Sequence, residues 1–109
     1  MAELGLKKDD LAAIIEVFKN NPSISGAAVF GSRAGGSHKP YSDVDIALYG
    51  DLNILELGRV IRDLDDLPLV YKFDVVAHGL VENPALLRHI EEAGVMVYKR
   101  DGLGGEDGG

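Results

Sequence analysis

The stretch from Val29 to Leu48, VFGSRAGGSHKPYSDVDIAL, decides the fold of this chain. It reads as an apolar strand, a Gly-Ser turn at Gly31 and Ser32, a loop of small residues, and a second apolar strand that begins with two carboxylates. Backbone N–H groups and a hydroxyl in such a turn suit the oxygens of a phosphate group. The first half of the stretch therefore predicts a phosphate-binding turn.

The two carboxylates belong to Asp43 and Asp45, which are two residues apart at the start of the second strand. Alternation along a strand puts both on one face, with Cα atoms about 6.5–7 Å apart from a rise of roughly 3.3 Å per residue. Mg²⁺ binds carboxylate oxygens together with substrate phosphates. A phosphate-binding turn and a pair of metal-binding acids in one segment together predict a nucleotide site.

The remaining sequence predicts an α/β (α+β) fold, a mixed sheet of about four strands with helices packed mainly on one face. Amphipathic patterns predict helices over residues 6–20 and 53–64 and a third that starts after Asn83, a plausible N-cap followed by Pro84. Apolar runs predict strands over residues 23–30, 43–49, 69–77 and 95–98.

Length and composition define the class of protein. The chain has 109 residues, enough for one domain, which we place at residues 1–100, with a disordered Gly-rich acidic tail at 101–109. It has no cysteine, which excludes disulfides and thiolate chemistry. Its net charge of −7 argues against binding to DNA or RNA. No secretory leader and no membrane-spanning run stand out, so we expect a cytoplasmic protein.

Asp74 interrupts the otherwise apolar run of the third predicted strand. A charge at such a position is costly unless it is paired or bound to a metal ion. Asp74 therefore either joins Asp43 and Asp45 at a metal site or forms an edge-strand ion pair with Lys72 or Arg62.

The turn and its loop also have plain structural interpretations. Gly31 and Ser32 could form an ordinary turn with Ser32 as a helix N-cap. Arg33 could contact a phosphate, stack on a base or lie on the surface. Ser42 fits a role in orienting Asp43 through a local hydrogen bond. Three histidines, His38, His78 and His89, do not cluster in the sequence, and we expect them to be structural.

Gly31-Ser32, the Arg33 loop and Ser42-Asp43-Val44-Asp45 at this spacing resemble the nucleotidyltransferase superfamily typified by DNA polymerase beta. The short chain is similar to the minimal nucleotidyltransferases, the MNT antitoxins of HEPN-domain toxins, from about residue 8 to residue 98. One departure is visible, because Gly35 stands where these proteins commonly have a second arginine.

The resemblance implies a catalytic and metal-binding set of Asp43, Asp45 and Asp74 holding two Mg²⁺ ions, and nucleotide contacts from Gly31, Ser32, Arg33 and Ser42. It implies transfer of AMP from ATP to a hydroxyl, expected to be a tyrosine of a HEPN toxin, within a hetero-oligomer. The alternative is a non-catalytic antitoxin that blocks its partner by occlusion, which the glycine at position 35 favours. The three acids favour the enzyme.

Overall fold

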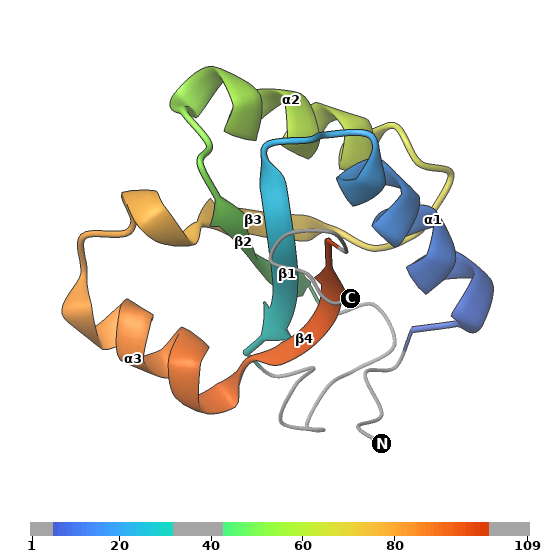
Figure 1. Cartoon of the computed structure of the whole chain (residues 1–109). Coiled ribbons are helices and arrows are strands. Elements are labelled where there is room, and N and C mark those ends of the chain that lie inside the picture. Colours follow the sequence, from blue (N-terminus) through green and yellow to red (C-terminus); the bar gives the residue numbers. More distant parts are fainter. Residues whose placement is uncertain (1–5, 32–42, 101–109) are drawn as a thin grey trace.

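The computed structural model describes residues 6–31 and 43–100 (Figure 1). The elements follow the order α1 (Lys8–Lys19), β1 (Ile24–Phe30), β2 (Val44–Gly50), α2 (Ile54–Asp65), β3 (Phe73–Ala77), a 3-10 turn η1 (His78–Leu80), α3 (Pro84–Ala93) and β4 (Val95–Lys99). The predicted tail at 101–109 and the loop at 32–42 lie outside the described residues.

The four strands form one mixed sheet in the order β3-β2-β1-β4. Strand β1 pairs antiparallel with both β2 and β4, whereas β2 and β3 run parallel. A parallel pair needs a crossover connection, and α2 provides it. The predicted mixed four-stranded α/β sheet is therefore confirmed.

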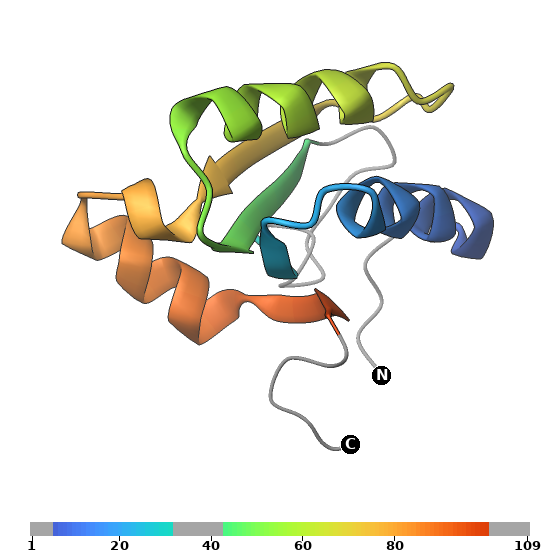
Figure 2. The same ribbon diagram turned by 45° about the horizontal axis from the view of Figure 1, so that its top comes forward.

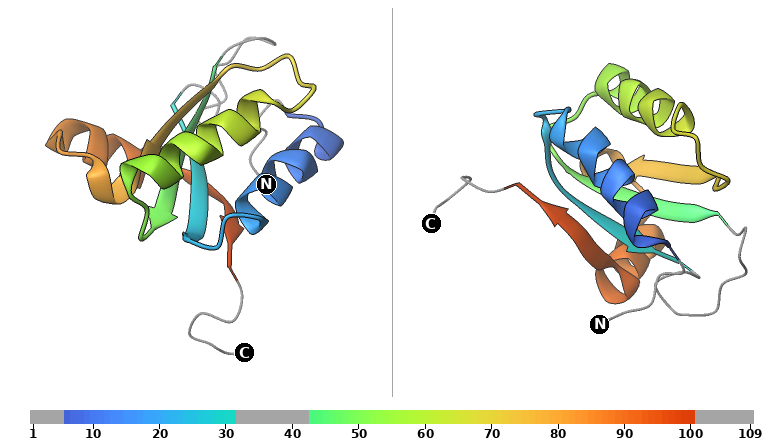
Figure 3. Two further views of the ribbon diagram at one scale, coloured as in Figure 1. Left: turned by 90° about the horizontal axis from the view of Figure 1, so that it is seen from above. Right: turned by 90° about the vertical axis from the view of Figure 1, so that its right-hand side faces the viewer.

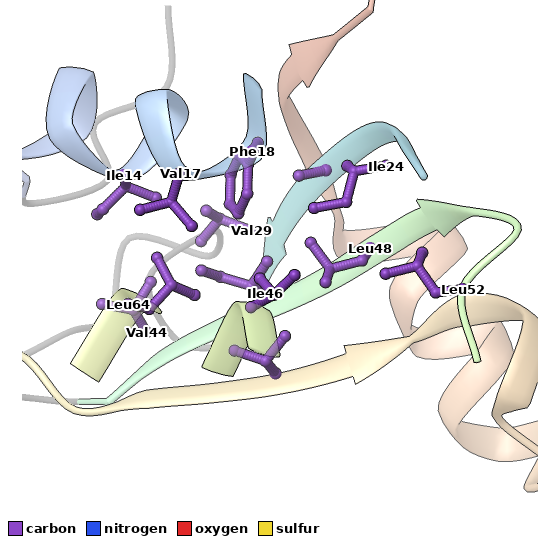
Figure 4. Packing of buried hydrophobic residues seen from close by; sticks show 13 residues of the cluster. Ile14, Val17, Phe18, Ile24, Val29, Val44, Ile46, Leu48, Leu52 and Leu64 are labelled. Atoms are coloured by element: carbon purple, nitrogen blue, oxygen red, sulfur yellow. The ribbon is translucent and has the colours of Figure 1, made fainter. Parts of the chain in front are cut away.

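Helices α1 and α2 cover one face of the sheet, and α3 packs on the opposite face (Figures 2 and 3). Between the two helices and the sheet lies the larger core, which Figure 4 shows from close by. It joins residues of α1, α2, β1 and β2, among them Ile14, Phe18, Val29, Val44, Ile46, Leu48 and Leu64. A smaller core under α3 contains Phe30, Ala47 and Ile90.

Two of the three helices begin at asparagine caps. Asn53 forms a capping box with Glu56, in which each side chain accepts a hydrogen bond from the other residue's backbone N–H, at 2.8 and 3.0 Å. The predicted cap of α3 is confirmed, because the side chain of Asn83 accepts from the backbone N–H groups of Ala85 and Leu86. Both caps satisfy N–H groups that a helix leaves unpaired at its start.

The third strand begins four residues later than the sequence predicts, at Phe73 rather than Leu69. Strand β2 begins at Val44, which pairs with Phe73 and donates a backbone hydrogen bond to Lys72, so no described strand residue pairs with positions 69–71. Among these residues Val70 is exposed, and the Tyr71 hydroxyl donates a hydrogen bond to Asp10 of α1. An apolar run without a strand beside it forms a connection instead.

Within residues 6–31 and 43–100, none of the helices combines the length and the apolar character that crossing a membrane requires.

Leu64 and Leu55 provide a test of the packing on α2. Leu64 is fully buried, while Leu55, on the same helix, is 83% exposed. We expect Leu64→Ala to lower the free energy of unfolding by about 2–5 kcal/mol, because it leaves a cavity between α2 and the sheet. Leu55→Ala should change it by less than about 0.5 kcal/mol. Urea unfolding of both variants measures this, and equal effects would contradict the described packing.

Candidate functional site

The parallel pairing of β2 and β3 brings Asp45 and Asp74 side by side. They are direct partners in the register, each the second residue of its strand. Neighbouring strands lie about 4.8 Å apart, and residues at matching positions of parallel strands point to the same face. The face is that of α3, because Ala47, two residues after Asp45, packs in the core under that helix. Two carboxylates thus meet at the edge of the smaller core.

Asp43 precedes β2 and is exposed, as is Asp74, whereas Asp45 is half-buried. Burial raises the pKa of the Asp45 carboxyl above its ordinary value, and the negative charges of Asp74 and Asp43 raise it further. Asp43 and Asp74 therefore both act electrostatically on Asp45. Their side chains do not converge on one point as a ready group of three ligands, within the residues that the structure describes.

Gly31 closes the site from the side of β1. Phe30, the last residue of β1, is paired with Asp45, and the chain turns immediately afterwards at Gly31 with a φ of +77°. A Cβ atom built on Gly31 would overlap Oδ2 of Asp45. Only glycine allows the backbone to approach the carboxylate this closely in this conformation. Ser32, Arg33 and Ser42, the other predicted nucleotide contacts, lie outside the described residues, as does Gly35.

His89 lies at the site although the sequence analysis gave it no role. Its ring makes an edge contact with Phe30 at 5.8 Å between centroids, and its charge acts on Asp45 to lower the pKa of that carboxyl. The sequence carried no signal for this, because only the docking of α3 across β1 and β2 brings His89 there. His78, by contrast, stacks on Tyr49 at 4.7 Å, at the other end of β2.

The donor set fits a divalent metal ion. Carboxylate oxygens are the ligands that Mg²⁺ prefers, and a half-buried carboxylate beside two others is unfavourable until a cation compensates the charge. The raised pKa of Asp45 is the physical sign of this uncompensated charge.

The chain is similar in sequence to known proteins. The model of the polymerase beta nucleotidyltransferase family matches residues 12–103. A Methanocaldococcus jannaschii protein named "Putative protein adenylyltransferase MJ1217" is 31% identical over 94 residues, which cover 84% of this chain and 95% of that protein.

Solved structures share the fold. A toxin–antitoxin complex with AMP-PNP contains a chain with a TM-score of 0.70 at 22% identity, covering 83% of this chain and 73% of that one. A tri-AMPylated Shewanella oneidensis HEPN toxin in complex with its MNT antitoxin gives a TM-score of 0.67 at 18% identity, covering 87% and 74%.

Gly31→Ala tests the close approach to Asp45. We expect this variant to lose about 1–3 kcal/mol of stability, because alanine is strained at this φ and its Cβ must displace the carboxylate. The matched control is Gly58→Ala in α2, where a Cβ meets nothing within 4 Å and should add about 0.5–1 kcal/mol. Thermal unfolding compares the two, and a neutral Gly31→Ala would contradict the described turn.

Asp45→Asn tests whether the ionised Asp45 carboxylate destabilises the fold. The folded-state pKa of Asp45 is raised above its ordinary value of 3.8, so the folded protein loses stability as the pH rises through that window. We therefore expect Asp45→Asn to be more stable than the wild type at pH 7, by at most about 1 kcal/mol, and the gain to vanish near pH 3. Urea unfolding against pH measures it, with Asp51→Asn as the control. A less stable Asp45→Asn at pH 7 would refute this account.

Proposed function

This chain belongs to the polymerase beta nucleotidyltransferase family, and we propose that it transfers AMP from ATP to a hydroxyl group of a partner protein. The observation that carries the proposal is the register pairing of Asp45 with Asp74, together with the raised pKa of Asp45. The acceptor that we propose is a tyrosine of a HEPN toxin, which the AMPylation would silence. Support comes from the names of the M. jannaschii relative and of the S. oneidensis complex.

In the proposed reaction the acceptor oxygen forms a bond to the α-phosphorus of ATP as the bond to the β-phosphate oxygen breaks. Pyrophosphate leaves, and Asp74, exposed at the site, accepts the hydroxyl proton. Asp43, Asp45 and Asp74 would hold two Mg²⁺ ions, which neutralise the charge of the triphosphate. The Gly31 turn, with Ser32, Arg33 and Ser42, would hold the phosphates. Because the reaction consumes ATP, we place it in the cytoplasm.

A non-catalytic antitoxin is the second candidate. The glycine at position 35 favours it, because an arginine there would add a cation for the triphosphate. An occluding protein needs its docking surface but not its carboxylates. The two candidates therefore differ in what the loss of the acids does.

The deciding experiment co-expresses the protein encoded beside this one, the expected HEPN partner, with the wild type, with Asp43→Asn/Asp45→Asn and with Asp51→Asn. Intact mass spectrometry should show the partner heavier by whole AMP units with the wild type and Asp51→Asn. The double variant should lower the rate by about a hundredfold or more, because it removes most of the charge that binds the metal ions.

Adding the single variant Asp45→Asn separates a loss of folding from a loss of chemistry, because this variant is expected to be at least as stable as the wild type. An unmodified partner that co-purifies equally with the wild type and the double variant would overturn the enzyme and leave occlusion as the account. A partner modified equally by all of these forms would overturn the assignment of these carboxylates.

A further inference from the structure

A groove of about 300 Å³ lies over the outer edge of β3. Ile54 and Leu57 of α2 line it from one face of the sheet, and Leu86 of α3 lines it from the other face. Residues of opposite faces can line one groove only where the sheet ends. The floor is therefore the edge of β3 at Val75, Val76 and Ala77.

This edge has no strand beside it within residues 6–31 and 43–100, because β3 is the first strand of the order β3-β2-β1-β4. An edge strand presents backbone N–H and C=O groups that can pair with another extended chain. The walls are apolar and unusually open to water, with Ile54 69% and Leu80 42% exposed. An extended segment would pair with such an edge and place alternate side chains against the walls.

The groove and the candidate site lie on the same strand, because β3 carries residues of both. Val76 lines the groove, and Asp74 lies two residues before it on the same strand and the same face, about 6.5 Å away from a rise of roughly 3.3 Å per residue. A segment lying along β3 would thus have one residue in the groove and another at Asp74. The distance matches two residues of an extended acceptor segment.

Charge favours a segment of the partner protein over a second copy of this chain as the occupant of the groove. Among the described residues that line the groove, only Glu82 is charged. The amino-terminal end of β3 carries the exposed carboxylate of Asp74 beside Asp45. A second copy of this chain would bring its own net charge of −7 to this acidic edge. An acceptor segment with basic residues around its hydroxyl is complementary to it.

We propose that the edge of β3 is the docking site of the acceptor segment, which adds to the sheet as an extra strand. The segment places one apolar side chain against Leu86 and its hydroxyl two residues away on the same face, at Asp74. The residue between them faces Ile54 on the other side of the sheet. The proposal rests on the proposed function, which it deepens by assigning where and in what conformation the protein substrate binds.

The first test compares Ile54→Asp with Leu55→Asp. These neighbours lie in the first turn of α2 and are both exposed, at 69% and 83%, but only Ile54 lines the groove. We expect Ile54→Asp to lower kcat/KM for AMP transfer to the partner roughly ten- to hundredfold, from the loss of one buried apolar contact, with ATP binding unchanged. Leu55→Asp should stay within about twofold. Equal rates for the two variants would overturn the proposal.

The second test reads docking directly. Because the sequence has no cysteine, Leu80→Cys supplies a single thiol for benzophenone maleimide, with Leu55→Cys as the control. Irradiation with the partner should crosslink Leu80→Cys to the peptide that carries the AMP-modified hydroxyl. Crosslinks to a remote surface of the partner, or to a second copy of this chain, would refute it.

The two tests separate this proposal from the one that it rests on. A wild type that transfers no AMP refutes the proposed function before any groove variant is compared. The photocrosslink does not require AMP transfer, so in that case it still shows whether a segment of the partner occupies the edge of β3.

Discussion

The in-register parallel pairing of β2 and β3 is the constraint on which the candidate site depends. It places Asp45 directly beside Asp74 and points both to the face that α3 covers only in part. A shift by one residue would turn one carboxylate into the main core, because successive strand residues point to opposite faces. The same pairing positions Val44 and Ile46 in that core, so packing on one face fixes the carboxylates on the other.

The arrangement keeps an unfavourable charge where a well-packed fold would avoid one. Burial and two neighbouring carboxylates raise the pKa of Asp45, and Gly31 approaches it in a backbone conformation that other residues rarely adopt. Neither feature stabilises the described fold. Arg100 shows the contrast, because its guanidinium donates hydrogen bonds to the carbonyls of Ile24, Phe18 and Asn21. Local violations of this kind are typical of functional sites.

Much of this was predictable from the sequence, because its signals are local. The alternation Asp43-Val44-Asp45-Ile46 identified the buried face of β2, and Asn83-Pro84 identified the start of α3. What depends on pairing was not predictable. The start of β3 at Phe73 follows from where β2 begins, and the position of His89 follows from how α3 crosses the sheet. No local sequence pattern predicts the start of β3 or the position of His89. Ser32, Arg33 and Ser42 belong to the segment 32–42, outside the described residues, so their expected nucleotide contacts stay predictions.

The edge of β3 combines a site carboxylate with an apolar groove. A short domain with one sheet must leave two edge strands, and here β4 and β3 take those places. β3 is the edge strand that carries a site carboxylate, and it is flanked by the groove between α2, η1 and α3. Exposed apolar walls on an edge strand favour unwanted association, and a net charge of −7 opposes pairing between copies. An edge that has no strand beside it among the described residues, and that carries a site carboxylate, is suited to an extended, basic partner segment.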